Sequence, residues 1–250
     1  QVIEVEDKVA PDIYRIYTLP NGKKMIDGVM ELVGEHWKTI NLPIDFINQP
    51  IILHQVVTSD AAIPVVSQIQ NVSVSQFELR IKAEEAYTTK LSRKSIAWIA
   101  MEAGTQTTDY QLDVNSLLVS EVAQAVNFQN AFASTPALFF SSQTTEEIDP
   151  FTLRQNGLTT TGATLNLQEE ASDDVELMHT DERVGYLAIE RLGSIKEERG
   201  ILIGEVGTAV VNSNWKTITL NHTYSNPVII ANSLSNLDGG AGTVSIRNVS

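Results

Sequence analysis

Two pairs of adjacent glutamates have the residue types and spacing most suggestive of chemistry. Among the four such pairs in the chain, these are Glu84 with Glu85 and Glu169 with Glu170. Paired carboxylates can bind Ca²⁺ or accept hydrogen bonds from sugar hydroxyls. Adjacent residues in a strand point to opposite faces, so neither pair can serve as the acid and nucleophile of a glycosidase. We favour solvated surface charges for both pairs, and we expect no catalytic residues and no enzyme activity.

Other catalytic and metal-binding patterns are missing from the sequence. The histidines are scattered without ligand spacing, at His36, His54, His179 and His222. There is no cysteine, which excludes thiolate zinc sites, disulfides and cysteine catalysis. Asp173 with Asp174, and Asp181 with Glu182, lack the spacing of an EF-hand loop. No nucleophile elbow, P-loop or Rossmann fingerprint is present. We therefore expect no metal site and no cofactor.

The charge of the chain restricts its partners. The formal net charge is −14, from 17 basic and 31 acidic residues, and residues 105–195 hold 14 acidic residues against 3 lysines or arginines. Such a surface repels phosphate backbones and argues against nucleic acid as a partner, and against sulfated or uronic glycans. No apolar run approaches the roughly 18 residues of a membrane span. The chain begins with Gln1 and has no signal peptide, so we expect a mature or excised part of an exported protein.

An internal repeat organises the chain. The string WKTINL at 37–42 returns as WKTITL at 215–220, and each is followed by a proline and an aliphatic run, at Pro50 and Pro227. A more diverged third copy contains Pro136 at the same offset from its aromatic residue. The period is 86 and then 91 residues, which fits a small domain better than a solenoid unit.

Each unit alternates polar and apolar residues in short runs. Phe77, Leu79 and Ile81 share one parity, with charged residues between them, and this pattern indicates half-buried antiparallel strands. The apolar run 51–57 predicts a central strand. The tryptophans, which we place in strands and cores, are Trp37, Trp98 and Trp215. The sequence thus predicts an all-β chain of tandem antiparallel six-stranded β-sandwiches.

We divide the chain at the limits of the repeat. The expected parts are a linker with a β-hairpin at 1–27, unit one at 28–104, a linker at 105–117, unit two at 118–192, a linker at 193–204, and an incomplete unit three at 205–250. Unit three lacks the last two strands of the pattern. Its strand 227–231 should therefore need cover from residues beyond 250, from the 14–26 hairpin of a neighbouring molecule, or from unit two.

The strand pattern resembles the H-type lectin domain. The resemblance rests on W-x-x-I-x-L, then an aromatic residue and P-I-I-L, then F-x-L-x-I and finally I-A-W-I-A; it covers most of 30–103, more weakly 118–190, and the front half of the pattern in 205–250. It implies six-stranded antiparallel sandwiches that trimerise and bind galactose or N-acetylgalactosamine at the subunit interface. The arginine of the family's sugar site falls on Gln68 in unit one and on Arg154 in unit two. The tryptophan–histidine pair of that site falls on the glutamate pairs 84–85 and 169–170.

The resemblance favours a glycan-binding or adhesive role in a secreted or cell-surface protein, with neutral glycans as ligands. Arg154 with Glu169 or Glu170 is the expected site, and Gln68 with Glu84 and Glu85 is its counterpart in unit one. One alternative is a structural spacer or filament whose repeats have lost sugar binding. The other is an ancillary carbohydrate-binding region of a larger glycan-degrading enzyme. The incomplete third unit is where other protein chains would bind.

Overall fold

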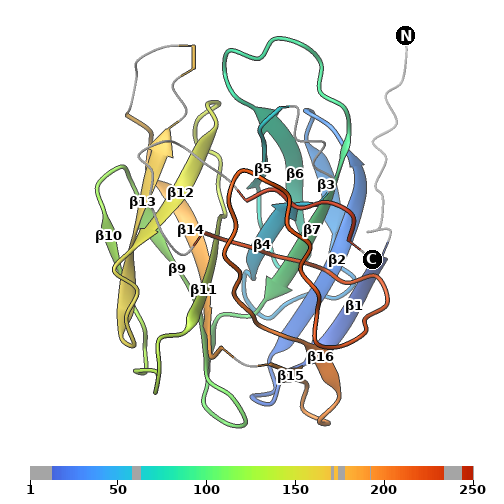
Figure 1. Cartoon of the computed structure of the whole chain (residues 1–250), viewed down its shortest axis with the longest axis vertical. Helices are drawn as coiled ribbons and strands as arrows, with labels where there is room; N and C mark the ends of the chain where they lie inside the picture. The colour runs from blue at the N-terminus through green and yellow to red at the C-terminus, as the bar shows by residue number, and fades with distance from the viewer. Residues whose placement is uncertain are drawn as a thin grey trace.

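The fold consists of antiparallel β-strands. A computed structural model describes residues 13–57, 63–169, 172–173, 178–191, 193–233 and 244–249. No residue within these ranges is in a helix, and every paired strand is antiparallel. The all-β prediction is confirmed. Figure 1 shows two layered units side by side, with the C-terminal segment crossing in front of them.

The first sandwich pairs a four-stranded sheet with a three-stranded sheet. The first sheet has the order β1-β2-β7-β4 and the second has the order β3-β6-β5. The strands are β1 (Ile13–Thr18), β2 (Lys24–Val33), β3 (Lys38–Asn41), β4 (Ile51–Val56), β5 (Val65–Gln70), β6 (Gln76–Ala83) and β7 (Lys94–Met101). Between the sheets lies a core that includes Ile26, Ile52, Phe77, Leu79 and Trp98. Trp98 has no exposed surface, as its place within an apolar strand predicts.

The second sandwich repeats this topology. Its sheets have the orders β8-β9-β14-β11 and β10-β13-β12. The strands are β8 (Gly104–Gln106), β9 (Leu112–Val119), β10 (Gln124–Asn127), β11 (Ala137–Ser142), β12 (Phe151–Asn156), β13 (Gly162–Glu169) and β14 (Glu182–Ile189). Pro50 and Pro136 each precede the edge strand of a four-stranded sheet, β4 in one sandwich and β11 in the other. The two prolines therefore occupy equivalent places in a structural repeat.

Each sandwich has seven strands where six were expected, and the unit boundaries differ accordingly. The hairpin of 1–27 is β1 with the start of β2, and it belongs to the first sandwich. The expected linker 105–117 forms most of β8 and part of β9. β1 has no fully buried residue and β8 has only Gln106, so neither strand carries the apolar signature that revealed the repeat.

β4 lies at the edge of its sheet and not at the centre, although its residues are buried on both faces. Ile52 and Val56 pack into the core of their own sandwich. Ile51 and Leu53 pack into a second cluster, the shared cluster, which also contains residues of β9, β11 and β14. The second sandwich thus covers the outer face of β4. The apolar run is therefore buried on both faces, as a central strand would be, but the neighbour that covers its outer face comes from the next repeat.

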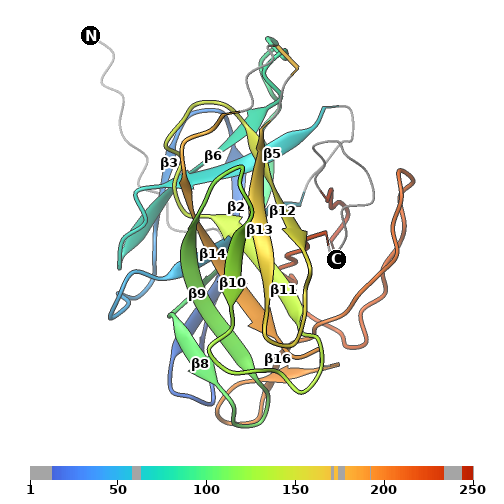
Figure 2. The same ribbon diagram turned by 90° about the vertical axis from the view of Figure 1, so that its left-hand side faces the viewer.

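The third repeat contains no strand in 205–233 or 244–249. The expected linker 193–204 instead holds the short hairpin β15 (Ile195–Lys196) and β16 (Leu202–Gly204). Trp215, expected in a core, is 42% exposed, and Arg247 lies over its ring at 3.8 Å from the centroid. Figures 1 and 2 show this segment extended along one side of the two sandwiches. The expected strand at 227–231 is not present in the structure.

Candidate functional site

The residues predicted to bind sugar are largely held by bonds within their own sheet. Arg154 on β12 is 7% exposed, and its Nε donates to Gln168 Oε1 at 2.6 Å. Gln68, the equivalent residue on β5, is 2% exposed and accepts from Arg80 Nε at 2.9 Å. Arg154 thus bonds to Gln168 within its own sheet, and of its two expected partners, Glu169 and Glu170, the second lies outside the described residues.

The two glutamate pairs have different surroundings. Glu84 and Glu85 follow β6, and Glu170 lies outside the described residues. Glu169 is the last residue of β13 and is paired with Phe151, just as Ala83 is paired with Val65 in the first sandwich. Both strands alternate between half-buried and buried residues and end on a buried one. Glu169 thus places a carboxylate where the first sandwich has a buried alanine.

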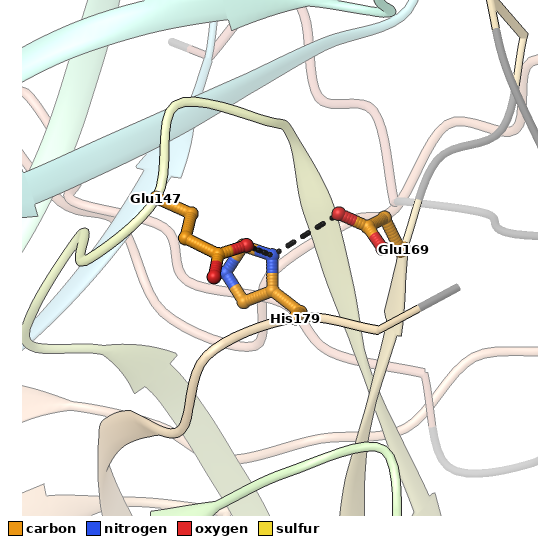
Figure 3. Close-up of side chains that lie close together, drawn as sticks. All are labelled: Glu147, Glu169 and His179. Carbon is orange, nitrogen blue, oxygen red and sulfur yellow. Dashed lines mark hydrogen bonds and ion pairs between the residues drawn. The ribbon is translucent and has the colours of Figure 1, made fainter. Parts of the chain in front are cut away.

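His179 is the partner of this buried carboxylate. Its side chain has no exposed surface, and its ring packs against Phe151 with centroids 4.7 Å apart and ring planes tilted by 54°. Nδ1 lies 3.3 Å from Glu169 Oε1 and 3.4 Å from Glu147 Oε2, while Nε2 lies 3.2 Å from Glu182 Oε1. Figure 3 shows Glu147 and Glu169 approaching the same ring nitrogen from different directions. We call these four side chains the His179 cluster.

Hydrogen bonds from the second sandwich fix the carboxylates of the His179 cluster. Glu182 is fully buried and accepts from the Thr144 hydroxyl and from the Glu146 amide at 2.8 Å. Glu147 accepts from the amide of Thr180 at 3.0 Å and from its hydroxyl. The cluster is therefore positioned by two loops, β11–β12 and β13–β14, and by the ends of β13 and β14.

Burial and charge act in opposite directions on the groups of the cluster. Burial raises the pKa of Glu169, although its bond to His179 opposes the shift. Burial alone would lower the pKa of His179, but the bonds to Glu182 and Glu169 outweigh it and raise that pKa. The hydroxyl of Thr180 is the largest cause of the lowered pKa of Glu147.

A second group of carboxylates lies near the cluster, where the two sandwiches meet. Oxygen atoms of Glu85, Asp149 and Glu169 lie within 4.8 Å of one another. The amide of Ala86 donates to Ser172 Oγ at 3.0 Å, which brings the β6–β7 loop against the second sandwich. The structure thus brings Glu85 of the first sandwich close to Glu169 of the second.

Side chains of the second sandwich seal the free backbone edge of β4. Gln143 accepts from Ile52 N at 2.8 Å and donates to Ile52 O at 2.7 Å. Ser141 Oγ accepts from His54 N at 3.2 Å. The ring of His54 crosses the same boundary, with Nε2 3.1 Å from Ser142 O and Nδ1 2.8 Å from Ser67 Oγ. Bonds of this kind satisfy buried backbone groups that an edge strand otherwise leaves unpaired.

The third repeat contacts the second as the second contacts the first. Phe140 N donates to Asn232 Oδ1 at 3.2 Å, and Asn232 Nδ2 donates to Phe140 O at 3.1 Å. Phe140 is 86 residues after His54, and Asn232 is 91 residues after Ser141, which are the two spacings of the repeated prolines. The same side chain-to-backbone contact therefore occurs at both junctions.

Comparison with known proteins gives one similarity. The chain is 24% identical over 201 residues to halomucin of Haloquadratum walsbyi, which covers 75% of this chain and 2% of that protein. No family model and no solved structure matches. Within its described residues the structure contains no helix long and apolar enough to cross a bilayer. The similarity fits a secreted or cell-surface protein, and the chain spans only a small part of the length of halomucin.

Sequence reasoning missed Glu147, Glu182 and the role of His179. The available signal was the acidic residue at an apolar strand position, Glu169, together with the short spacing from His179 to Glu182. A search for ligand spacing among the histidines alone could not find the cluster, because it contains one histidine and carboxylates from separate loops.

Proposed function

We propose that this chain is a non-catalytic structural block of a large secreted or cell-surface protein. Its repeats are locked edge to edge by polar side chains that bind a neighbouring strand. The observation that carries the proposal is the recurrence of one contact, from His54 to Ser141 and from Phe140 to Asn232. Recurrence at equivalent positions supports a specific junction between repeats.

The junction has the composition of a permanent contact. The shared cluster buries Leu53, Ala137, Leu187 and Ile189 to below 9% exposure, and Ile230 of the third repeat packs against it. Burial of each leucine or isoleucine side chain contributes about 1.5–3 kcal/mol. The bonds of Gln143 fix the position of the second sandwich along β4, because the amide and the carbonyl of Ile52 are bound at the same time. Together these features favour a rigid block over flexibly tethered domains.

Glycan binding is the competing proposal. It rests on the resemblance to the H-type lectin domain, and Arg154 would be its central residue. The bond of Arg154 to Gln168, and that of Glu169 to His179, occupy groups that a sugar would need. Roles as a filament, as a docking site for other chains at 205–250 or as an ancillary region of an enzyme stay predictions.

Unfolding of the full chain tests the structural role. The wild type should unfold in one cooperative transition in urea. Gln143→Ala should divide this single unfolding transition into two transitions. The Ile52 amide and carbonyl lose their partners in the variant, so the two sandwiches should unfold independently. Gln106→Ala is the matched control, since Gln106 is also a buried glutamine and donates to carbonyls of Thr108 and Tyr110 within one sandwich. It should lower stability while keeping a single transition.

Two results would refute the structural proposal. One is independent unfolding of the two sandwiches in the wild type. The other is specific binding on an array of neutral glycans that Arg154→Ala abolishes while the fold is retained. The second outcome would establish a lectin.

A further inference from the structure

Three polar atoms of the His179 cluster have the mutual spacing of metal ligands. Nδ1 of His179 lies 3.3 Å from Glu169 Oε1 and 3.4 Å from Glu147 Oε2, and the ligand atoms of all three residues lie within 4.8 Å of one another. Around a tetrahedral ion with bonds of about 2.0–2.1 Å, neighbouring ligand atoms are separated by about 3.3–3.4 Å. The two measured distances match this edge length (Figure 3).

Hydrogen bonding within the cluster leaves this arrangement unexplained. Nδ1 carries at most one proton, yet it faces two carboxylates, and both contacts are longer than the ~2.7–2.9 Å of a charge-assisted hydrogen bond. Independently, Glu169 is 7% exposed, and its Oε2 is buried with no hydrogen-bond partner in the described residues. A buried carboxylate oxygen without a donor is costly unless a cation neutralises it.

Glu182 orients the histidine for this role. Its Oε1 lies 3.2 Å from the ring Nε2 and can accept a hydrogen bond from it. The Glu182 carboxylate is itself held by the hydroxyl of Thr144 and the amide of Glu146. A carboxylate on one ring nitrogen keeps the proton there and leaves the other nitrogen's lone pair free for a metal. In the His179 cluster the free nitrogen would be Nδ1, which faces Glu147 and Glu169.

We propose that His179 Nδ1, Glu147 and Glu169 bind a divalent ion of the Zn²⁺ class, with Glu182 as the positioning residue. One imidazole and two carboxylates match the three protein ligands of open zinc sites, with water in the fourth position. Ca²⁺ takes about six to eight oxygen ligands, so the nitrogen ligand favours zinc or a similar metal over calcium. The site would fasten the β11–β12 loop to the β13–β14 loop. It departs from the sequence-based expectation of no metal site.

Metal titration of the full chain tests this site. The chain is stripped with a chelator, and Zn²⁺ is added in competition with a chromogenic chelator. One ion should bind per chain and raise the midpoint of thermal unfolding. Co²⁺ should give the intense visible absorption of four-coordinate cobalt, which weakly held surface ions lack. Excess Ca²⁺ should not displace either metal.

Variants locate the ion. Glu147→Gln is the main variant, because Glu147 lies in a loop and is partly exposed, so the fold should survive; affinity should fall at least tenfold. Glu169→Gln should do the same, and Glu182→Gln should weaken binding by about 10–100-fold and alter the cobalt spectrum. His222→Gln is the control, since His222 Nδ1 lies 2.9 Å from a single carboxylate, Glu205, and is exposed; affinity should not change.

Three outcomes would overturn the proposal. The first is no Zn²⁺ binding at 100-fold molar excess over the chain. The second is binding that both Glu147→Gln and Glu169→Gln leave unchanged, which would place the ion elsewhere on the acidic surface. The third is a cobalt spectrum of octahedral type, which would show hydrated ions at the cluster.

Discussion

Protonation of His54 should weaken the junction between the sandwiches. His54 is 9% exposed, and burial lowers its pKa from 6.5 to about 4, although its bond to the Ser142 carbonyl opposes the shift. The ring contacts that the structure describes are Ser67 Oγ and Ser142 O, neither of them charged. The unfolded chain therefore binds a proton more tightly than the folded chain. The contribution of neutral His54 to the free energy of unfolding is fully present above pH ~6.5 and is lost as pH falls toward 4.

The size of the effect follows from the shift. Each pKa unit corresponds to about 1.4 kcal/mol, so the full loss is about 3 kcal/mol and about 2 kcal/mol is lost between pH 7 and pH 5. Burial raises the pKa values of the Asp27 and Asp113 carboxyl groups, so protonation of these groups stabilises the folded chain as pH falls. The measurement must therefore be a difference between two proteins.

His54→Gln isolates the contribution, because glutamine can bond to the same oxygens and does not titrate. Urea unfolding of the wild type and of His54→Gln is measured from pH 7.5 to pH 5. The stability of the wild type relative to the variant should fall by about 2 kcal/mol. His36→Gln is the control, since His36 is exposed, and its curve should follow the wild type. A constant difference between wild type and His54→Gln over this range would refute the reasoning.

Three other substitutions test the packing. Trp98→Ala should cost about 3–5 kcal/mol in urea unfolding, because the side chain is fully buried against Phe77; a loss below about 1 kcal/mol would contradict this. Gly28→Ala should destabilise by about 1–3 kcal/mol, since its methyl group would lie 2.5 Å from Trp98 Cζ2; an unchanged midpoint would show that the ring can shift. Asn232→Ala should cost about 1–3 kcal/mol, because the Phe140 amide and carbonyl lose their partners, and should speed proteolysis within 205–233; equal cleavage rates would count against the contact.

The sequence predicted the repeat and the strand class from core residues alone. Alternation around Phe77 and the prolines before β4 and β11 are local signals, and they survive in both sandwiches. The hairpin that contains β1 was predicted but placed outside unit one, and β8 was missed, because edge strands need few apolar residues. β4 was misplaced to the sheet centre because sequence shows that a residue is apolar, but not which neighbour covers it.

The candidate site was harder to predict for a related reason. Glu169 stood out as part of a charged pair, while its burial follows only from its register against Phe151. Glu147, Glu182 and His179 meet because two loops fold onto the same end of the second sandwich, and no spacing rule links loops of irregular structure. Arg154 was chosen by resemblance, and the sheet supplies its partner Gln168.

The junction between repeats has a direction. One repeat offers the backbone of an edge strand, at His54 or Phe140, and the next offers a side chain, at Ser141 or Asn232. Such head-to-tail contacts either close into a ring or continue without end. Here the third repeat also reaches back to the first, because Gln55 Nε2 donates to Val244 O at 2.9 Å and Arg15 Nη1 donates to Ser225 O at 3.0 Å. All three repeats therefore contact one another within this chain, although the bond that returns to the first repeat is accepted by Val244 and not by Ala231, the position equivalent to His54 and Phe140.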